Sequence, residues 1–151
     1  GELLHRYHHH FQYGVGIDPM CNAIPAYANI QLIRGKFPDD LLPIRQFDAI
    51  VALAVVEHIA AAALPSFFES CFQWLQPRGV LICTIPHPRV DKILAVLRAM
   101  HLVAGMNLDE HHGFDVAQTI PLATAAGLQL KHQHRFQAGL NHLFVFAKAG
   151  S

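Results

Sequence analysis

The stretch Phe47-Asp-Ala-Ile-Val-Ala-Leu-Ala54 decides the fold that this sequence predicts. It is almost continuously apolar, which is typical of a strand buried on both faces of a parallel sheet. Residues 79–85 form a second apolar run, and Pro86 and Pro88 end it because proline cannot donate to a strand ladder. Between the two runs, residues 64–75 carry apolar side chains at helical spacing. A strand, a helix and a strand in this order predict a parallel crossover unit.

The alternation of strands and helices continues on both sides of this unit. Gly127 ends a predicted helix, and Ala138-Gly139 is the expected turn of a terminal antiparallel hairpin. We therefore expect one α/β domain over residues 1–151, a three-layer Rossmann-like fold with a mostly parallel sheet and a C-terminal antiparallel hairpin. The further strands are expected at residues 13–18, 29–35, 128–136 and 140–148, and the further helices at residues 1–7, 90–100 and 120–126.

The composition limits the possible functions. The 151 residues and 16.8 kDa allow one domain, and 52% hydrophobic residues exclude a disordered chain. Eleven basic and eleven acidic residues give zero net charge, which argues against binding to nucleic acid or to an anionic membrane surface. The longest apolar run, residues 49–56, is far shorter than the ~20 residues that cross a bilayer. The three cysteines form no CxxC pair, and we expect a cytoplasmic protein.

Asp18 is the first candidate for a functional residue, because it ends the predicted strand at residues 13–18. Ligands of open α/β sheets bind at the carboxyl ends of the strands, and a carboxylate there can accept hydrogen bonds from the hydroxyls of a ribose. Asp18 followed by Pro19 is equally a common turn sequence. The residue by itself leaves both interpretations open.

Four sequence strings, in order, resemble class I S-adenosylmethionine-dependent methyltransferases. They are Tyr13-Gly-Val-Gly-Ile-Asp-Pro19, Ile33-Arg-Gly-Lys-Phe-Pro38, the stretch from Phe47 to Ile59 with its Glu-His pair, and Leu75-Gln-Pro-Arg-Gly-Val-Leu-Ile-Cys-Thr-Ile-Pro86. The closing residues 136–148 are also similar to the terminal hairpin of that fold. The likeness is greatest to members that methylate small molecules, and it covers nearly the whole chain. It implies S-adenosylmethionine as the cofactor and a small molecule as the methyl acceptor.

Carried over to this chain, the resemblance implies a set of cofactor-binding residues. Asp18 would bind the ribose hydroxyls, and Gly35 would open a loop that borders the adenine ring. Many members have an acid directly after this glycine that accepts a hydrogen bond from the adenine amino group, whereas this chain has Lys36. Asp39 is close enough in sequence to reach the adenine instead. The other positions implied are Ile17, Pro19 and Met20 beside the adenosine, Phe37 against the adenine, and Ala52, Leu53 and Ala54 along the methionine part.

The resemblance also places the methyl acceptor after the strands that end at Ala54 and Ile85. His87 follows the second of these strands, and we expect it, or His111 and His112, to orient or deprotonate the acceptor, since imidazole is the obvious base near neutral pH. His58 matches the Glu-His pair and either touches the acceptor or packs beneath the strand end. The expected pocket is completed by Val55, Val56, Pro86 and residues 105–115.

Gly1 matches the last glycine of the loop that joins the first strand of these enzymes to their first helix; a residue left from tag cleavage is the alternative. The strand before this loop would lie between the strands that end at Asp18 and Ala54. We therefore expect a strand upstream of residue 1. Without it, two rows of backbone groups lose their partners, at about 1–3 kcal/mol for each group that is buried.

The 12 histidines raise the question of a metal site. His5, His8 and His9 have the i, i+3, i+4 spacing of metal ligands on a helix, but no complete ligand set is present, so we expect no metal. Two alternatives to a methyltransferase stay open at this point: a nicotinamide-dependent dehydrogenase with Asp18 on the ribose, and a non-catalytic protein of the same fold. We expect a small-molecule partner, with no nucleic acid and no membrane, and leave the acceptor atom and the oligomeric state open.

Overall fold

The computed structural model describes residues 2–22, 27–40, 46–87 and 114–150. The chain divides into two compact units, Gly1–Ile44 and Arg45–Ser151. The helix expected at residues 90–100 lies outside the described residues. In the part of the chain that is described, no helix is both long enough and apolar enough to cross a membrane.

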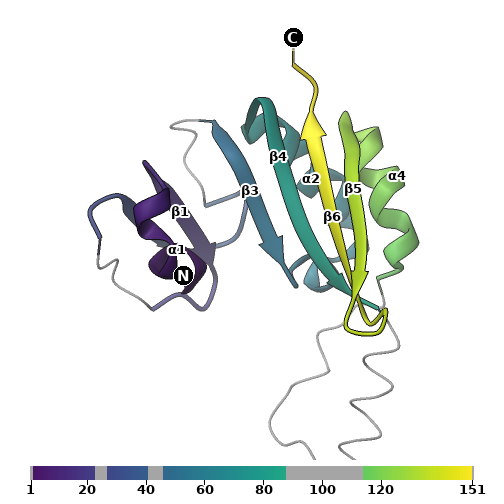
Figure 1. The fold of residues 1–151 in the computed structure, drawn as a ribbon, viewed down its shortest axis with the longest axis horizontal. Helices are drawn as coiled ribbons and strands as arrows, with labels where there is room; N and C mark the ends of the chain where they lie inside the picture. The colour runs from purple at the N-terminus through teal and green to yellow at the C-terminus, as the bar shows by residue number, and fades with distance from the viewer. Residues whose placement is uncertain (1, 23–26, 41–45, 88–113, 151) are drawn as a thin grey trace, which may run out of the picture. The chain divides into compact units, whose positions relative to one another are not determined.

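The N-terminal unit is a parallel pair of strands with a short helix against it (Figure 1). β1 pairs with β2 from Gly14 opposite Ile30 to Asp18 opposite Arg34, so both predicted strands are confirmed. The absence of a side chain at Gly14 admits the helix, since a Cβ there would lie 2.8 Å from Cδ2 of Leu4. The elements are α1 (Glu2–Arg6), the 3-10 turn η1 (His8–His10), β1 (Gly14–Asp18) and β2 (Ile30–Arg34).

The C-terminal unit contains a four-stranded sheet in the order β3-β4-β6-β5. β3 and β4 run parallel, and β6 pairs antiparallel with both β4 and β5, which confirms the crossover unit and the terminal hairpin. The α/β class is confirmed as well, although this sheet is mixed rather than mostly parallel. The strands are β3 (Phe47–Leu53), β4 (Leu75–Pro86), β5 (Leu128–Phe136) and β6 (Asn141–Lys148).

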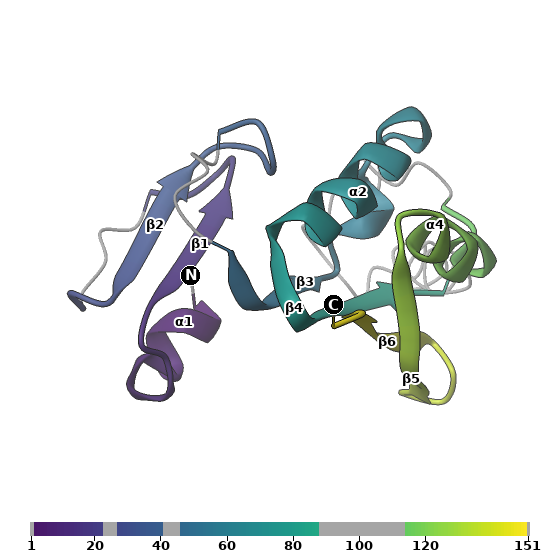
Figure 2. The same ribbon diagram turned by 90° about the horizontal axis from the view of Figure 1, so that it is seen from above.

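Two helices, α2 (Leu64–Trp74) and α4 (Thr119–Ala125), cover one face of this sheet (Figure 2). Pro65 lies in the first turn of α2, where its missing amide costs no helical hydrogen bond. The layer between helices and sheet is apolar. Its buried side chains include Phe68 and Cys71 of α2, Leu81, Cys83 and Ile85 of β4, and Phe144 and Phe146 of β6. The shorter elements are the 3-10 turns η2 (Val56–His58), η3 (Ala61–Ala63) and η4 (Val116–Gln118).

β3 is more exposed than its sequence predicts. A strand covered on both faces was expected at residues 47–54, but Val51 is 43% and Leu53 is 47% exposed, and Ala52 alone within the strand is buried. The reason is that Val51 and Leu53 point to the face of the sheet opposite to α2 and α4, and among the described residues of this unit no helix covers that face. β3 also ends the four-stranded sheet and pairs with β4 alone among the described strands. The apolar run is therefore correct as a strand signal and wrong as evidence for two covered faces.

β1 and β3 belong to different sheets. Within the described ranges β1 pairs with β2 alone and β3 with β4 alone, so each keeps one edge without a neighbouring strand. An edge of this kind presents a row of unpaired amide and carbonyl groups. The additional strand expected between the strands that end at Asp18 and Ala54 stays a prediction.

Gly127→Ala is expected to destabilise the protein more than Gly139→Ala. Both glycines have a left-handed backbone, with φ of +93° and +82°, so an alanine at either position costs about 1–2 kcal/mol in backbone strain. At Gly127 the new Cβ would also lie 3.0 Å from Cε2 of Phe72, whereas nothing lies within 4 Å at Gly139. Denaturant unfolding of both variants measures the difference. Equal losses of stability would show that the Phe72 ring moves aside freely.

Candidate cofactor and acceptor site

Asp18 lies at the carboxyl end of β1, and its side chain is exposed. Its Oδ1 accepts a 2.6 Å hydrogen bond from the backbone amide of Met20, which fixes the carboxylate in an Asx-type turn. This bond occupies one carboxylate oxygen and leaves the other for a ligand hydroxyl. The turn interpretation and the ribose interpretation are therefore compatible. Of the neighbouring predicted residues, Pro19, Met20 and Lys36 are exposed, and Ile17 and Phe37 are half-buried.

The loop after β2 is closed by Asp40. Oδ2 of Asp40 accepts a 2.8 Å hydrogen bond from the Lys36 amide, and the Asp40 amide donates to the Lys36 carbonyl over 2.9 Å. A Cβ on Gly35 would lie 2.5 Å from Cβ of Asp40, so the loop needs a glycine there. The Gly35 amide donates to the Asp18 carbonyl over 3.2 Å, which joins the two strand ends. Asp40 thus closes this loop through the Lys36 backbone, and the contact of Asp39 with the adenine stays a prediction.

Ala54 follows β3 in a left-handed backbone conformation, with φ of +51°. Its amide lies within hydrogen-bond distance of two acceptors on Thr84 of β4, the carbonyl at 3.0 Å and Oγ1 at 3.1 Å. At this strand end Leu53 is 47% and Val55 is 41% exposed. Ala52, the remaining position expected along the cofactor, is buried.

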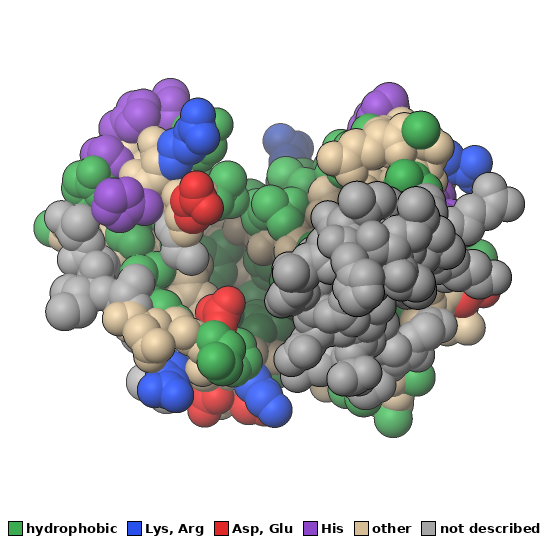
Figure 3. Space-filling model, turned by 90° about the horizontal axis from the view of Figure 1, so that it is seen from below, with side chains coloured by type: hydrophobic (Ala, Val, Ile, Leu, Met, Phe, Trp, Pro, Cys, Tyr) green, Lys and Arg blue, Asp and Glu red, His purple; other side chains and the backbone are tan. Residues whose placement is uncertain are grey.

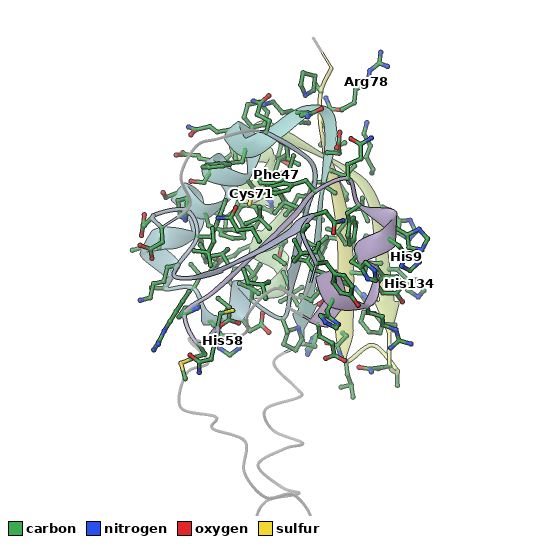
Figure 4. The ribbon with its side chains drawn as sticks, turned by 90° about the vertical axis from the view of Figure 1, so that its left-hand side faces the viewer. His9, Phe47, His58, Cys71, Arg78 and His134 are labelled. Atoms are coloured by element: carbon green, nitrogen blue, oxygen red, sulfur yellow. The ribbon has the colours of Figure 1, made fainter. Side chains whose placement is uncertain are left out.

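The turn η2 contains the Glu-His pair and buries one member of it. Glu57 is 4% exposed, whereas His58 is exposed and lies at the opposite end of the C-terminal unit from Arg78 (Figure 4). Burial raises the pKa of the Cys83 thiol on β4 to about 12, and the negative charge of nearby Glu57 adds to the effect. The residue that packs beneath the strand end, together with the fully buried Val56, is therefore Glu57 and not His58.

His87 and His142 lie together where β4 ends and β6 begins. His87 is half-buried, and its amide donates a 2.8 Å hydrogen bond to the Leu140 carbonyl. His142 is 5% exposed and lies opposite Ile85 of β4 in the sheet register. The two rings are nearly parallel, with centroids 5.8 Å apart and an interplanar angle of 22°. The structure thus brings a second imidazole to the predicted acceptor residue that follows β4; Pro86, directly before it, is half-buried.

His142 favours its neutral form. Burial lowers the pKa of its imidazole below the ordinary value of 6.5, and the nearby Arg135 and His87 lower it further. Both ring nitrogens are buried, and neither has a hydrogen-bond partner among the described residues. The ring at this position is therefore an uncharged donor and acceptor with both of its polar atoms unused.

Some predicted site residues lie outside the described residues. These are Gly1, His111 and His112, together with residues 105–113. α1 ends at Arg6, so His5, His8 and His9 do not share one helix as their spacing suggested. Histidines gather on the surface of the N-terminal unit (Figure 3), and His8 stacks on Tyr27 with ring centroids 3.5 Å apart. In the described ranges, no group of three or more His, Cys, Asp or Glu residues is placed to hold a metal ion.

Asp40, Thr84 and His142 were not predicted as residues of the cofactor or acceptor site. The signal for His142 was present, because His142, Phe144 and Phe146 are alternate residues and share the buried face of β6. Asp40 and Thr84 carry no comparable signal, since one acts by closing a loop and the other by holding a neighbouring strand end.

The free energy of unfolding is expected to fall as the pH drops below about 6.5, and to fall less steeply in His142→Phe. The lowered pKa of His142 means that the unfolded chain binds a proton there more readily than the folded chain does. This contribution to stability is complete above 6.5, the ordinary histidine pKa, and is lost as the pH falls toward the lower pKa of the folded chain.

Denaturant unfolding at several pH values on both sides of 6.5 measures this slope. His134→Phe is the matched control, because His134 is an exposed histidine on the neighbouring strand β5, and it should keep the wild-type slope. A wild-type slope in His142→Phe would contradict the burial of a neutral imidazole.

Comparison with known proteins identifies the family. Residues 2–135 match the family model described as Methyltransferase domain. The fold is similar to that of the N-methyltransferase NodS from Bradyrhizobium japonicum WM9, with 18% identity over 96% of this chain and 78% of that chain and a TM-score of 0.66. The structure of NodS in complex with S-adenosyl-L-homocysteine is 19% identical over 98% of this chain and 72% of that chain, with a TM-score of 0.67.

A second similar structure is the complex between the Trm112 methyltransferase activator of Haloferax volcanii and the putative methyltransferase. The identity is 13% over 91% of this chain and 73% of that chain, and the TM-score is 0.67. A comparison with curated proteins gives no match. Identities this low show a shared fold and no more. The family model covers most of the chain, however, and it identifies methyl transfer rather than hydride transfer as the chemistry. The chain belongs to the methyltransferase domain family and is a class I S-adenosylmethionine-dependent methyltransferase.

Proposed function

We propose that this methyltransferase acts on a small molecule that binds beside His87, at the carboxyl end of β4. The observation that carries the proposal is the pair of imidazoles at this position, a half-buried His87 with the buried, neutral His142 next to it. A partly buried base suits a ligand small enough to enter a recess. The zero net charge of the chain supports the same choice, because it offers no general attraction for a polyanion such as nucleic acid.

The N-terminal unit carries groups that fit an adenosine. The Asp18 carboxylate is exposed, and the Met20 amide occupies one of its oxygens, so the other is available for a ribose hydroxyl. In the loop after β2, Phe37 would pack on the adenine. The Asp40 carboxylate adds an acid to the loop in which this chain has Lys36. When bound, S-adenosylmethionine supplies a methyl group activated by a positively charged sulfur.

The C-terminal unit would align the acceptor and take up its proton. Methylation of a hydroxyl, thiol or protonated amine releases a proton, and a ring nitrogen of His87 is the proposed base: the acceptor X–H bond breaks and an N–H bond forms on the imidazole. Leu53 and Val55 supply an exposed apolar surface at the neighbouring strand end, which would exclude water from the reacting atoms, and the fully buried Val56 packs beneath them. His58, exposed at the same strand end, is a proposed contact of the acceptor.

We also propose a cytoplasmic location. Cys21, Cys71 and Cys83 are all free thiols, which fits a reducing compartment. Burial raises the pKa of Cys71 as well as that of Cys83, so neither thiol is a reactive nucleophile.

Methyl transfer to a panel of small molecules tests the proposed acceptor. The protein is incubated with S-adenosylmethionine labelled in its methyl group and with amines, phenols, thiols and carboxylic acids, and in parallel with total tRNA and with unfolded protein. Label is expected on a small molecule, and kcat should fall by about 10²–10⁴-fold in His87→Ala because a general base is lost. His132→Ala, an exposed histidine of β5, is the control and should keep the wild-type rate. Label on tRNA or protein alone, or an unchanged kcat in His87→Ala, would contradict the proposal.

Asp18→Asn is expected to weaken the binding of S-adenosyl-L-homocysteine by about tenfold or more, since a hydrogen bond to a charged group contributes about 1.5–3 kcal/mol. Asp48→Asn makes the same change of charge at an exposed acid near the amino end of β3, and its affinity should match the wild type. Calorimetric titration of the three proteins measures the dissociation constants. If Asp18→Asn binds as tightly as Asp48→Asn, Asp18 does not hold the ribose.

A further inference from the structure

The ring nitrogens of His142 have no apparent use in packing the protein. They are buried in a side chain that is 5% exposed, and neither has a hydrogen-bond partner among the described residues. Buried polar groups are normally satisfied, so an unsatisfied pair calls for a functional explanation. Phenylalanine occupies the next two inward positions of the same strand. The rings of His142, Phe144 and Phe146 form a row in which each step between centroids is 6.0 Å.

The nitrogen-bearing ring stands at the end of this row that lies beside His87. Two imidazoles joined by one N–H···N bond in a common plane have centroids about 5 Å apart, the sum of an N···N distance of about 2.9 Å and two ring radii. The observed centroids are 5.8 Å apart, and the planes differ by 22°. The rings are stacked rather than edge to edge, and no ring nitrogen of His87 is bonded to His142, so the bond requires the half-buried His87 ring to turn toward His142. The backbone amide of His87, fixed to the Leu140 carbonyl, need not move.

We propose that His142 is a positioning residue for His87, in which a ring nitrogen of neutral His142 accepts a hydrogen bond from the N–H of the His87 ring. This bond fixes the plane of the His87 ring and directs its other nitrogen away from the core, toward the acceptor. The proposal rests on the proposed function of His87. When the acceptor X–H bond breaks and its proton joins His87, the resulting imidazolium keeps its bond to His142, which gains no proton and stays neutral.

The surroundings of His142 fit an acceptor role. Its partners in the sheet register are Ile85 on β4 and Arg135 on β5. Burial, together with Arg135 and His87, lowers the pKa of the ring, so His142 presents a lone pair rather than a positive charge. A charged His142 would repel an imidazolium at His87, whereas a neutral one can accept its N–H.

Acylation by diethyl pyrocarbonate tests the proposal without cofactor or methyl acceptor. The reagent attacks the unprotonated ring nitrogen, and peptide mass spectrometry reports the rate at His87 itself. His142→Phe keeps the row of rings and removes both nitrogens, so the rate at His87 should fall about two- to tenfold, the effect of one net hydrogen bond. His142→Gln offers an amide oxygen in place of the ring nitrogen and should restore part of the rate. His134→Phe, which removes an exposed imidazole from β5, should leave the rate at His87 unchanged.

Two further measurements keep the test independent of variant folding and of the methyl acceptor. Thermal unfolding should show that His142→Phe is folded, because phenylalanine continues the row of buried rings formed by Phe144 and Phe146. Nitrogen-15 spectra of the unmodified protein, labelled at histidine, should show one ring nitrogen of His142 as a hydrogen-bonded acceptor. The proposal is overturned if both nitrogens of His142 are unbonded in solution, or if folded His142→Phe acylates at His87 as fast as the wild type. If His142→Phe alters the acylation rate at His87 but His87→Ala leaves kcat unchanged, the hydrogen bond between the two histidines is retained and the role of His87 as the base is overturned.

Discussion

β4 is the strand on which the C-terminal unit depends, because it is hydrogen-bonded along both edges. β3 joins one edge in parallel and β6 joins the other antiparallel. Its inward side chains Leu81, Cys83 and Ile85 have no exposed surface, since α2 and α4 cover that face of the sheet. A strand held in this way has a fixed register, and a slip by one residue would turn these side chains to the other face.

The opposite directions of its two neighbours explain how β4 assembles the proposed acceptor region. A parallel neighbour brings its carboxyl end to the carboxyl end of β4, and an antiparallel neighbour brings its amino end to the same place. Ala54 arrives from β3 and is held by Thr84, while His142 arrives from β6 and meets His87. Ala54 and Thr84 are 30 positions apart in the sequence, and His87 and His142 are 55 apart, yet both pairs meet at one strand end because of the topology.

The sequence predicts the positions of strands better than it predicts the burial and the contacts of their side chains. Every strand expected in the described ranges forms, since apolar runs and alternation report directly on strand geometry. The predicted burial of β3 was wrong because a continuous apolar run does not show whether helices cover one face of the sheet or both. Asp40 was missed for a different reason, because its contact with the Lys36 amide depends on the path of a loop, which no periodicity encodes. Asp18 and His87 could be proposed from the sequence because both stand at the ends of apolar runs.

Apolar and polar side chains of the core lie toward different ends of the buried sheet face. The inward residues toward the amino half of β4 and toward the end of β6 are apolar, as in Leu81 and Phe146. Glu57 and His142, two of the buried polar residues among those described, both lie near the carboxyl end of β4. An apolar residue of similar volume would be more stable at His142, where neither nitrogen is satisfied by a described residue. Local rules of this kind are broken in proteins chiefly at functional sites. The same strand face thus serves the core at one end, and at the other it supplies directional hydrogen-bonding groups that a packed apolar layer cannot offer.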